Sequence, residues 1–336
     1  MSQRVTIEQL AEWLRAREDI VIMGHVSPDG DATGCALAVW HALRALGKRA
    51  VVCLPKGVPV LYKHLPGAHQ VMDTEAGQLP FAPKTALAVD VSDHERLGEA
   101  GKALFDSCEF QGVLDHHGTN TGFGQLYALD GEAAAAGEIL LDMIEAMGVK
   151  LDPVIAECLF VAISTDCGQF SFPNTRPETF RAAARCVEAG ADVSRITEEL
   201  YRTRSVGRTK LLATVLSGLE LSPDGKVAWA RLTQQMLRDC GANRADNEGI
   251  INYLLEMEGV QVAVLAIERE GGESKMSLRS KNPFDVARDV AIPLGGGGHS
   301  NAAGASLYIP LEEALQKTLG VIREALKAGV AKTDKA

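Results

Sequence analysis

The chain has 336 residues, with 34 Lys and Arg against 44 Asp and Glu, so its formal charge at pH 7 is −10. A composition of 46% hydrophobic and 23% charged residues excludes wholesale disorder and is typical of a globular protein with two ordinary domains or one large one. The acidic balance argues against a protein that coats long nucleic acid, because such binding depends on many Lys and Arg contacts with phosphates.

The start of the chain is typical of the first turn of a helix and not of a signal peptide. No run reaches the ~20 apolar residues that span a bilayer. The seven cysteines are odd in number and never spaced as Cys-x-x-Cys, which favours reduced thiols. These features predict a cytoplasmic protein.

Strands and helices are expected to alternate through the first half of the chain. Short, polar-bounded apolar runs predict buried strands of a mostly parallel sheet at 20–23, 50–54, 86–89 and 112–114. Apolar residues at helical spacing predict helices at 32–46, 132–147 and 155–163. This alternation indicates an α/β domain, over residues 1–190, with helices flanking the sheet.

The second half predicts a connector and a smaller α/β domain with a mixed sheet. Residues 191–220 form the expected connector, because a helical pattern with a basic surface runs from 192 to 221; that surface is either solvated or turned towards substrate. The smaller domain is expected over 221–330. Its predicted elements are a turn at 222–225, strands at 226–232, 260–267 and 275–279, a turn at 271–272, and helices near 247–257 and 284–290. A frayed polar tail is expected at 328–336.

Histidines and aspartates gather where the predicted elements of the first domain end. In chain order they are His25, Asp29, Asp31, Asp90, Asp115, His116, His117 and Asp166. The ligand crevice of an open parallel sheet lies outside the carboxyl ends of its strands. The fold itself is therefore expected to bring these side chains together.

Four of these carboxylates, Asp29, Asp31, Asp90 and Asp166, would carry a costly negative charge in one crevice unless cations neutralise it. A mixed carboxylate and imidazole set without a matching cysteine favours Mn²⁺ or Mg²⁺, with Zn²⁺ or Co²⁺ less favoured. A pair of such ions suits in-line displacement at phosphorus. Taken singly, each residue also has an ordinary interpretation: Asp31 as a helix N-cap, and an isolated histidine as a hydrogen-bonded structural residue.

A second chemical feature is the glycine run 295–298, which His299 follows. Consecutive glycines let backbone N–H groups approach a phosphate closely, and a helix beginning after them would add its dipole. No Gly-Lys-Ser/Thr follows, so the run is not a Walker A loop. Arg279, shortly before it, is suited to gripping a phosphate or to pairing with an acid such as Asp285.

These residues resemble a known family. His25-x3-Asp29-x-Asp31, Asp90, Asp115-His116-His117 and Asp166 are similar, in order, to the four motifs of the DHH phosphoesterase superfamily. The segment 277–299 resembles its DHHA1 substrate domain. The resemblance spans about residues 10–325 and is nearest to the oligoribonuclease and pAp-phosphatase group, the nanoRNases, whose fourth motif is similar to 166–175. It implies a DHH domain, a DHHA1 domain and an active site in the cleft between them.

The resemblance also implies roles for single residues. The implied ligands of one Mn²⁺ are His25, Asp29 and Asp90, and those of the second are Asp31, Asp90, His116 and Asp166, with Asp90 bridging. His117 would polarise or protonate near the scissile phosphate, while Asp115 would orient the neighbouring histidine. The implied phosphate-binding residues are Arg279, Gly297, Gly298 and His299. Cys167 stands where many relatives have threonine, and burial of its thiol would make it inert.

The favoured function is a two-metal phosphoesterase that releases 5′-mononucleotides from short oligoribonucleotides and the 3′-phosphate from adenosine 3′,5′-bisphosphate (pAp). A stand-alone phosphodiesterase of cyclic di-AMP, or of linear pApA or pGpG, shares every motif. A RecJ-type DNA exonuclease and a family II pyrophosphatase fit less well. A non-catalytic nucleotide-binding sensor would lack at least one metal position, and here all six are filled. Short single-stranded oligoribonucleotides and pAp are the expected partners, without long duplexes or membranes, and a homodimer is compatible with the sequence.

Overall fold

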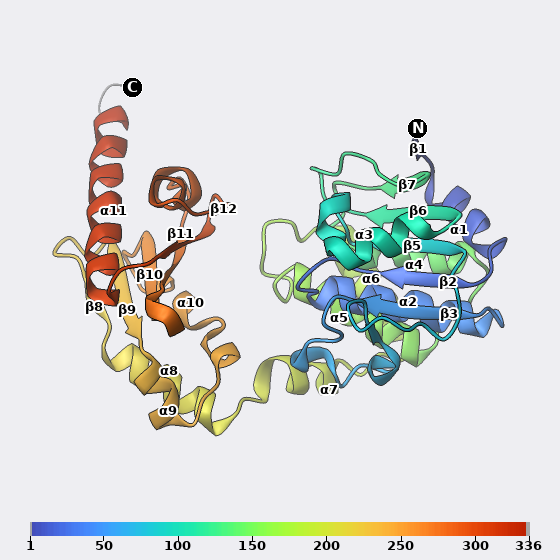
Figure 1. The fold of residues 1–336 in the computed structure, drawn as a ribbon, viewed down its shortest axis with the longest axis horizontal. Helices are drawn as coiled ribbons and strands as arrows, with labels where there is room; N and C mark the ends of the chain where they lie inside the picture. Colours follow the sequence, from blue (N-terminus) through green and yellow to red (C-terminus); the bar gives the residue numbers. More distant parts are fainter. Residues whose placement is uncertain (1, 334–336) are drawn as a thin grey trace. The chain divides into compact units, whose positions relative to one another are not determined.

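The structure, a computed structural model, describes residues 2–333, and the side chains of 299 and 328–333 lie outside what it describes. The chain divides into two compact units, Met1–Thr203 and Arg204–Ala336, a boundary that falls within the predicted connector (Figure 1). Each unit is α/β, as predicted. Among the described residues, no helix combines the length and the apolar character needed to cross a bilayer.

Seven parallel strands form the sheet of the first unit, in the order β1-β7-β6-β5-β2-β3-β4. Their bounds are β1 Gln3–Arg4, β2 Ile20–Met23, β3 Ala50–Leu54, β4 Met72–Asp73, β5 Thr85–Val89, β6 Phe110–Asp115 and β7 Leu126–Leu129. The four predicted strands are confirmed as β2, β3, β5 and β6. The two-residue edge strands β1 and β4 escaped prediction because they are too short to leave a pattern. The strand β7, Leu126–Leu129, was also missed although it is a short apolar run.

Helices cover both faces of this sheet. Their bounds are α1 Ile7–Arg15, α2 Gly30–Ala45, α3 Gly98–Ser107, α4 Ala136–Ala146, α5 Pro153–Asp166, α6 Pro177–Glu188 and α7 Val193–Thr197. In β2, Ile20 and Ile22 join the core that holds α1, α2, α4 and α5, whereas Val21 and Met23 point into the opposite core with Phe105 of α3. Burial on both faces explains why the central strands read as unbroken apolar runs.

The route of the chain through the sheet creates a crevice at its carboxyl edge. From β2 the chain passes to β3 and β4 on one side and then crosses to β5 on the other side of β2. Connections therefore leave β2 and β5 in opposite directions, which is the arrangement that opens a ligand crevice in such sheets.

Close helix packing sets the floor of this crevice. Gly34 lies in α2, and a Cβ built on it would be 2.4 Å from the carbonyl oxygen of Cys158 in α5 and 3.0 Å from the backbone nitrogen of Ala162. Both neighbours are backbone atoms, which cannot move aside as a side chain can, so only glycine permits this close approach of the two helices. The contact fixes the beginning of α2 beside the end of α5.

The second unit is built on a six-stranded mixed sheet in the order β12-β13-β11-β10-β9-β8. Its elements are α8 Val206–Ser217, β8 Glu220–Leu221, β9 Val227–Leu232, α9 Gln234–Cys240, α10 Ile250–Leu255, β10 Val262–Glu268, β11 Ser274–Ser280, β12 Gly297–His299, β13 Ala302–Leu307 and α11 Leu311–Thr333. Strands β9 and β10 are parallel, and the other neighbours are antiparallel. Helices α8, α9 and α10 pack on one face and α11 on the other.

Two predicted helices of the second half are wrong in detail. The continuous helix expected over 192–221 is interrupted, because a π-helical turn at Glu198–Arg202 ends in extended Thr203 and the side chain of Ser205 caps a new helix. The helix expected at 284–290 is reduced to a π-helical turn at Ala287–Ala291 and a 3-10 turn at Ile292–Leu294.

Two expectations near the end of the chain are also corrected. The glycine run does not lead directly into a helix; instead Gly297–His299 forms β12, which pairs with β13, and β13 in turn pairs with β11. The tail expected to fray from 328 is helical as far as Thr333, and 334–336 lie outside the described residues.

Candidate metal centre

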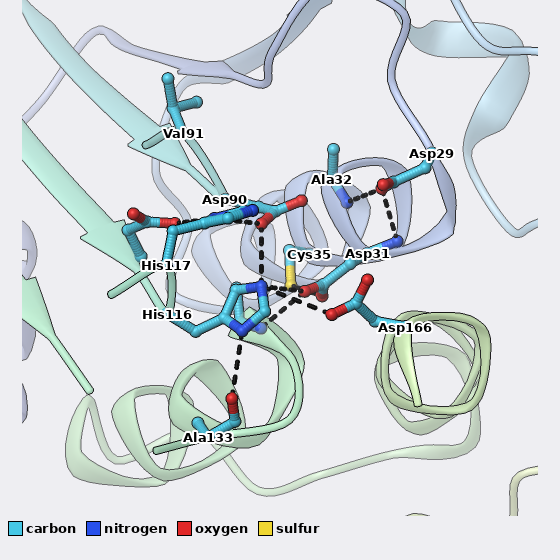
Figure 2. Close-up of polar contacts among 12 residues, drawn as sticks. Asp29, Asp31, Ala32, Cys35, Asp90, Val91, His116, His117, Ala133 and Asp166 are labelled. Carbon is cyan, nitrogen blue, oxygen red and sulfur yellow. Dashed lines mark hydrogen bonds and ion pairs between the residues drawn. The ribbon is translucent and has the colours of Figure 1, made fainter. Parts of the chain in front are cut away.

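The three adjacent strands β6, β5 and β2 end at this crevice, and each is followed by polar side chains. His25 lies two residues after β2, Asp90 follows β5 directly, and β6 ends at Asp115 before His116 and His117. Two helices complete the set: Asp29 and Asp31 stand at the beginning of α2, and Asp166 ends α5. The structure thus brings together all eight residues that the sequence singled out in the first domain. Figure 2 labels Asp29, Asp31, Asp90, His116, His117 and Asp166.

Ligand-type atoms of these side chains converge in three overlapping groups, each with its atoms within 4.8 Å of one another. The groups are His25 with Asp29 and Asp90; Asp31 with His116 and Asp166; and Asp90 with His116 and His117. Asp90 and His116 each belong to two groups. This overlap suits two cations that share ligands.

Asp90 is the centre of the cluster. Its side chain is 2% exposed, and its two oxygens lie 3.5 Å from Nε2 of His25 and 3.5 Å from Nε2 of His116. Oδ1 is buried and has no hydrogen-bond partner among the described residues. A buried carboxylate oxygen without a donor is costly unless a cation approaches it, so the residues present fit a bound metal ion.

His25 and His116 have the hydrogen bonds of metal-binding imidazoles. Nδ1 of His25 lies 2.9 Å from the carbonyl oxygen of Val26, and Nδ1 of His116 lies 3.1 Å from that of Ala133. If Nδ1–H donates in each bond, Nε2 keeps its lone pair and faces the carboxylates. Figure 2 shows the His116 ring between Asp31, Asp90 and Asp166.

The pKa shifts show how strongly these charges interact. Burial raises the pKa of Asp31 well above its usual value, and the neighbouring carboxylates of Asp90 and Asp166 add to the rise. Burial likewise raises the pKa of Asp166 to about 6. For His25 and His116, burial acts to lower the pKa, but bonds and charges of the surrounding carboxylates outweigh it and raise each pKa to about 10. The site concentrates negative charge, and divalent cations compete with protons for it.

Two contacts at the beginning of α2 separate the roles of its aspartates. Oδ1 of Asp29 accepts hydrogen bonds from the backbone N–H of Asp31 and of Ala32, at 3.1 and 3.0 Å, so Asp29 is the N-cap. Asp31 is fully buried, and its carboxylate accepts from the N–H groups of Ala136 and Gly137 at 2.6 and 3.0 Å. The N-cap interpretation raised for Asp31 is therefore wrong for that residue and right for Asp29.

Two side chains that contact the proposed ligands, those of Cys35 and Arg96, were missed by the sequence reasoning. The thiol of Cys35, one turn after Asp31, donates to Oδ1 of Asp31 at 3.1 Å. Arg96 brings a guanidinium nitrogen to 3.2 Å from Nδ1 of His25. Neither has a local sequence signal, because helical spacing alone marks Cys35 as core and a single arginine in a loop is unremarkable.

Asp115 does not join any of the metal-type groups but holds His117. The carboxylate is fully buried; Oδ1 lies 2.8 Å from Nδ1 of His117, and Oδ2 accepts from Nδ2 of Asn120 at 2.7 Å. These hydrogen bonds outweigh burial and lower the pKa of Asp115. Asn120, also missed, donates at 3.2 Å to the carbonyl oxygen of Val91. Its position in the polar loop three residues after His117 was the available signal.

Cys167 is fully buried directly after Asp166, and burial raises the pKa of its thiol. Its sulfur accepts a hydrogen bond from the backbone N–H of Phe170 at 3.3 Å. The thiol therefore has the inert environment that the sequence reasoning required for a structural cysteine.

In the second unit, the predicted phosphate-binding residues lie on β11 and β12. Arg279 is partly buried, which lowers its pKa, and it does not pair with Asp285, whose carboxylate accepts the backbone N–H of Arg288 at 2.9 Å. Gly298 has a φ of 141°, and a Cβ there would lie 2.6 Å from the carbonyl oxygen of Ala302. The predicted contact of the His299 side chain falls outside the described residues.

Comparisons with known proteins cover both units. The DHH family N-terminal domain matches residues 19–163, and the DHHA1 domain matches residues 224–328. The chain is 35% identical over 320 residues to the bifunctional oligoribonuclease and PAP phosphatase NrnA of Thermus thermophilus, covering 94% of this chain and 93% of that protein. It is 26% identical to the protein of the same name from Bacillus subtilis, covering 89% and 93%.

Among solved structures, an exopolyphosphatase-related protein from Bacteroides fragilis is similar, with a TM-score of 0.87 and 28% identity over 96% of this chain and 95% of that one. The relatives match along both units, so the similarity is not confined to one shared domain.

Proposed function

We propose, from the premise that this chain belongs to the DHH family and carries a DHHA1 domain, that it is a two-metal phosphoesterase of very short substrates. It releases 5′-mononucleotides from short oligoribonucleotides and removes the 3′-phosphate from pAp. The observation that carries the proposal is the carboxylate of Asp90, which two groups of ligand-type side chains share and whose buried Oδ1 has no hydrogen-bond partner among the described residues.

The proposed ligands of one ion are His25, Asp29 and Asp90, and those of the other are Asp31, Asp90, His116 and Asp166. Oxygen and imidazole donors without a thiolate favour Mn²⁺ over softer metals. When bound, two such ions supply an activated water and stabilise negative charge on the oxygens of an in-line displacement. Because every proposed ligand position carries a ligand-type side chain inside the cluster, an enzyme is favoured over a binding-only protein.

His117 is proposed to serve the substrate directly. Its side chain is 43% exposed, and its Nδ1 is held by Asp115, which raises the pKa of the imidazole. With Nδ1–H donated to Asp115, Nε2 remains to meet the scissile phosphate or the leaving oxygen. Asp115 orients the ring and stabilises its protonated form, as a buried carboxylate does for a catalytic histidine.

Arg279, Gly297, Gly298 and His299 are proposed to bind a further phosphate of the substrate. Nη1 of Arg279 donates to the carbonyl oxygen of Leu278 at 3.0 Å. Among the described side chains, no acidic group pairs with the guanidinium, so its remaining N–H groups are available to a phosphate. With a net charge of −10, the protein lacks the many cations that a long polyanion requires, which favours the smallest substrates.

A comparison of substrates tests the proposed function. The full chain with Mn²⁺ is given pAp, a dinucleotide, a 5-mer, a 20-mer and cyclic di-AMP, and kcat/KM is measured for each. We expect turnover of pAp and of the 2- to 5-mers, with kcat/KM for the 20-mer at least about tenfold lower. Blank reactions with both pAp and the short oligomers would overturn the proposal, and a preference for cyclic di-AMP would establish the alternative.

Removal of metal is expected to lower turnover of pAp to below about 1% of the starting value, because a buried cluster of carboxylates without cations neither binds nor polarises phosphate. Dialysis against EDTA followed by addition of Mn²⁺ or Mg²⁺ measures this. An independent readout is the melting temperature, which should rise on adding Mn²⁺ to the stripped protein because the ion binds the folded state. Full activity after stripping would contradict a metal centre.

Replacement of Asn120 with alanine is expected to lower kcat about tenfold with little change in KM, because Asp115, which holds His117 in place, loses the hydrogen bond from Asn120 that fixes its other oxygen. Steady-state kinetics on pAp checks this. The matched control is Asn252→Ala, at an exposed position of α10. Equal kcat values for the two variants would remove Asn120 from the site.

A further inference from the structure

A cavity of about 560 Å³ lies in the second unit between α11 and the beginning of β9. It is lined by Ser222, Pro223, Asp224, Lys226, Val227, Trp229, Gln261, Leu319, Arg323, Leu326 and Lys327. Its size falls within the roughly 300–1,000 Å³ of small-molecule sites. None of its lining residues belongs to the proposed metal or phosphate sites.

The cavity and Arg279 lie on opposite faces of the sheet. Trp229 pairs with Val264, whose side chain belongs to the core under α11. Arg279 pairs with Ala263, whose side chain belongs to the core under α10. Paired residues of adjacent strands share a face, so the sheet itself separates this cavity from the proposed phosphate-binding arginine.

The wall of the cavity is apolar. Val227, Leu319 and Leu326 supply aliphatic surface, and Trp229 supplies an aromatic ring. The indole Nε1 of Trp229 is itself buried, so a ligand in the cavity meets the ring and not its N–H group. An apolar wall with an aromatic ring favours a ligand with a flat apolar body.

The rim of the cavity is cationic. Lys226, Arg323 and Lys327 face a single acid, Asp224, whose carboxylate already accepts from Oγ of Ser222 at 2.6 Å and from the backbone N–H of Lys226 at 3.2 Å. Lys327 pairs with Glu324 at 3.1 Å, whereas Lys226 and Arg323 form no ion pair with a described residue. Two cations beside an apolar wall are complementary to an amphipathic anion.

We propose that this cavity is a second binding site, for an organic anion with a flat aromatic body, the chemistry of a purine mononucleotide. The ring lies against Trp229 and the leucines, and the phosphate is bound by Lys226 and Arg323. The site is separate from the proposed reaction, and neither depends on the other.

The indole N–H signals of the ¹⁵N-labelled full chain with Mg²⁺ test the proposal. The chain has three tryptophans, and Trp229→Phe identifies the signal of Trp229 by its loss. On titration with AMP we expect the Trp229 signal to move and to saturate. The signal of Trp40 should stay in place, because its indole already donates to the carbonyl oxygen of Ala50 at 3.1 Å.

Charge variants show whether the rim takes part. Arg323→Glu is expected to weaken AMP binding at least about fivefold, whereas Lys317→Glu, at an exposed position of the same helix outside the cavity, should leave it unchanged. Unmoved Trp40 signals in both variants show that the fold is kept. Adenosine, which has the ring without the phosphate, is expected to bind at least about fivefold more weakly than AMP.

Arg279→Ala separates the two sites. We expect the Trp229 shift to persist in this variant, since Arg279 lies across the sheet. A shift lost in Arg279→Ala, a Trp229 signal that stays in place up to about 5 mM AMP, or equal affinities for AMP and adenosine would each overturn the proposal. All these experiments measure binding of AMP or adenosine, so their results do not depend on whether the protein turns over pAp.

Discussion

Replacement of Asp90 with asparagine is expected to lower kcat about a thousandfold or more while the protein stays folded. Asp90 is the carboxylate common to the His25 and His116 sides of the cluster, so its loss weakens both proposed metal sites at once. Asparagine also suits the backbone, because Asp90 has a left-handed φ of 57° that Asn and Asp adopt more readily than alanine.

Steady-state turnover of pAp and thermal unfolding of the metal-free protein measure this prediction. Without metal, the Asp90→Asn protein should still unfold cooperatively, because asparagine has nearly the shape of aspartate and adopts the same backbone conformation. The rise in melting temperature on adding Mn²⁺ should shrink or vanish. The matched control is Asp239→Asn, an exposed aspartate of α9. Turnover above about a tenth of wild type, with the Mn²⁺-induced rise intact, would contradict a bridging role.

Replacement of Gly34 with alanine is expected to lower the free energy of unfolding by about 3 kcal/mol, near the upper range for overpacking. The added methyl group would meet the carbonyl oxygen of Cys158 at 2.4 Å, and a backbone atom yields less than a side chain. Helices α2 and α5 must move apart. Asp31 and Asp166 sit on these two helices, so turnover should fall as well.

Urea unfolding followed by circular dichroism gives the free-energy difference. Gly320→Ala is the matched control, because Gly320 lies in α11 with no atom within 4 Å of an added Cβ. There the same substitution should leave stability unchanged or raise it by up to about 1 kcal/mol, the helix preference of alanine over glycine. If both variants unfold at the same urea concentration as wild type, the contact between α2 and α5 is looser than described.

The sequence predicted the central strands of the first unit and the residues at their ends, but not the long-range hydrogen bonds that support those residues. Strands such as 20–23 are buried on both faces and leave an unbroken apolar signal, and the rule that ligands gather at strand ends then located His25 and Asp90. Contacts between distant residues leave no such signal. The hydrogen bond from Gly137 to Asp31 joins positions 106 residues apart, and Asn120, in the loop after β6, reaches Val91 in the loop after β5.

The elements of the second unit were harder to predict because the local sequence pattern and the strand pairing in the structure disagree. The glycine run 295–298 suggested a loop leading into a helix, yet the partner strand β13 draws Gly297–His299 into the sheet. Pairing with β13 determines the conformation of the glycine run, and no feature of the run's own sequence indicates that pairing. In the same way, the predicted helix over 192–221 has continuous apolar periodicity, yet extended backbone at Thr203 and the N-cap at Ser205 divide it.

The left-handed backbone at Asp90 also bears on how such a chain can change over time. An aspartate codon reaches asparagine or glycine through one base change, and both residues accept a positive φ. Of the other single-step replacements, Ala, Glu, Tyr and Val meet backbone strain, and His brings a larger ring into a buried position. The mutational path to a folded but inactive descendant is therefore narrow and leads through two residues. Duplicated copies that keep the fold and abandon the chemistry should carry Asn or Gly at this position more often than any other replacement.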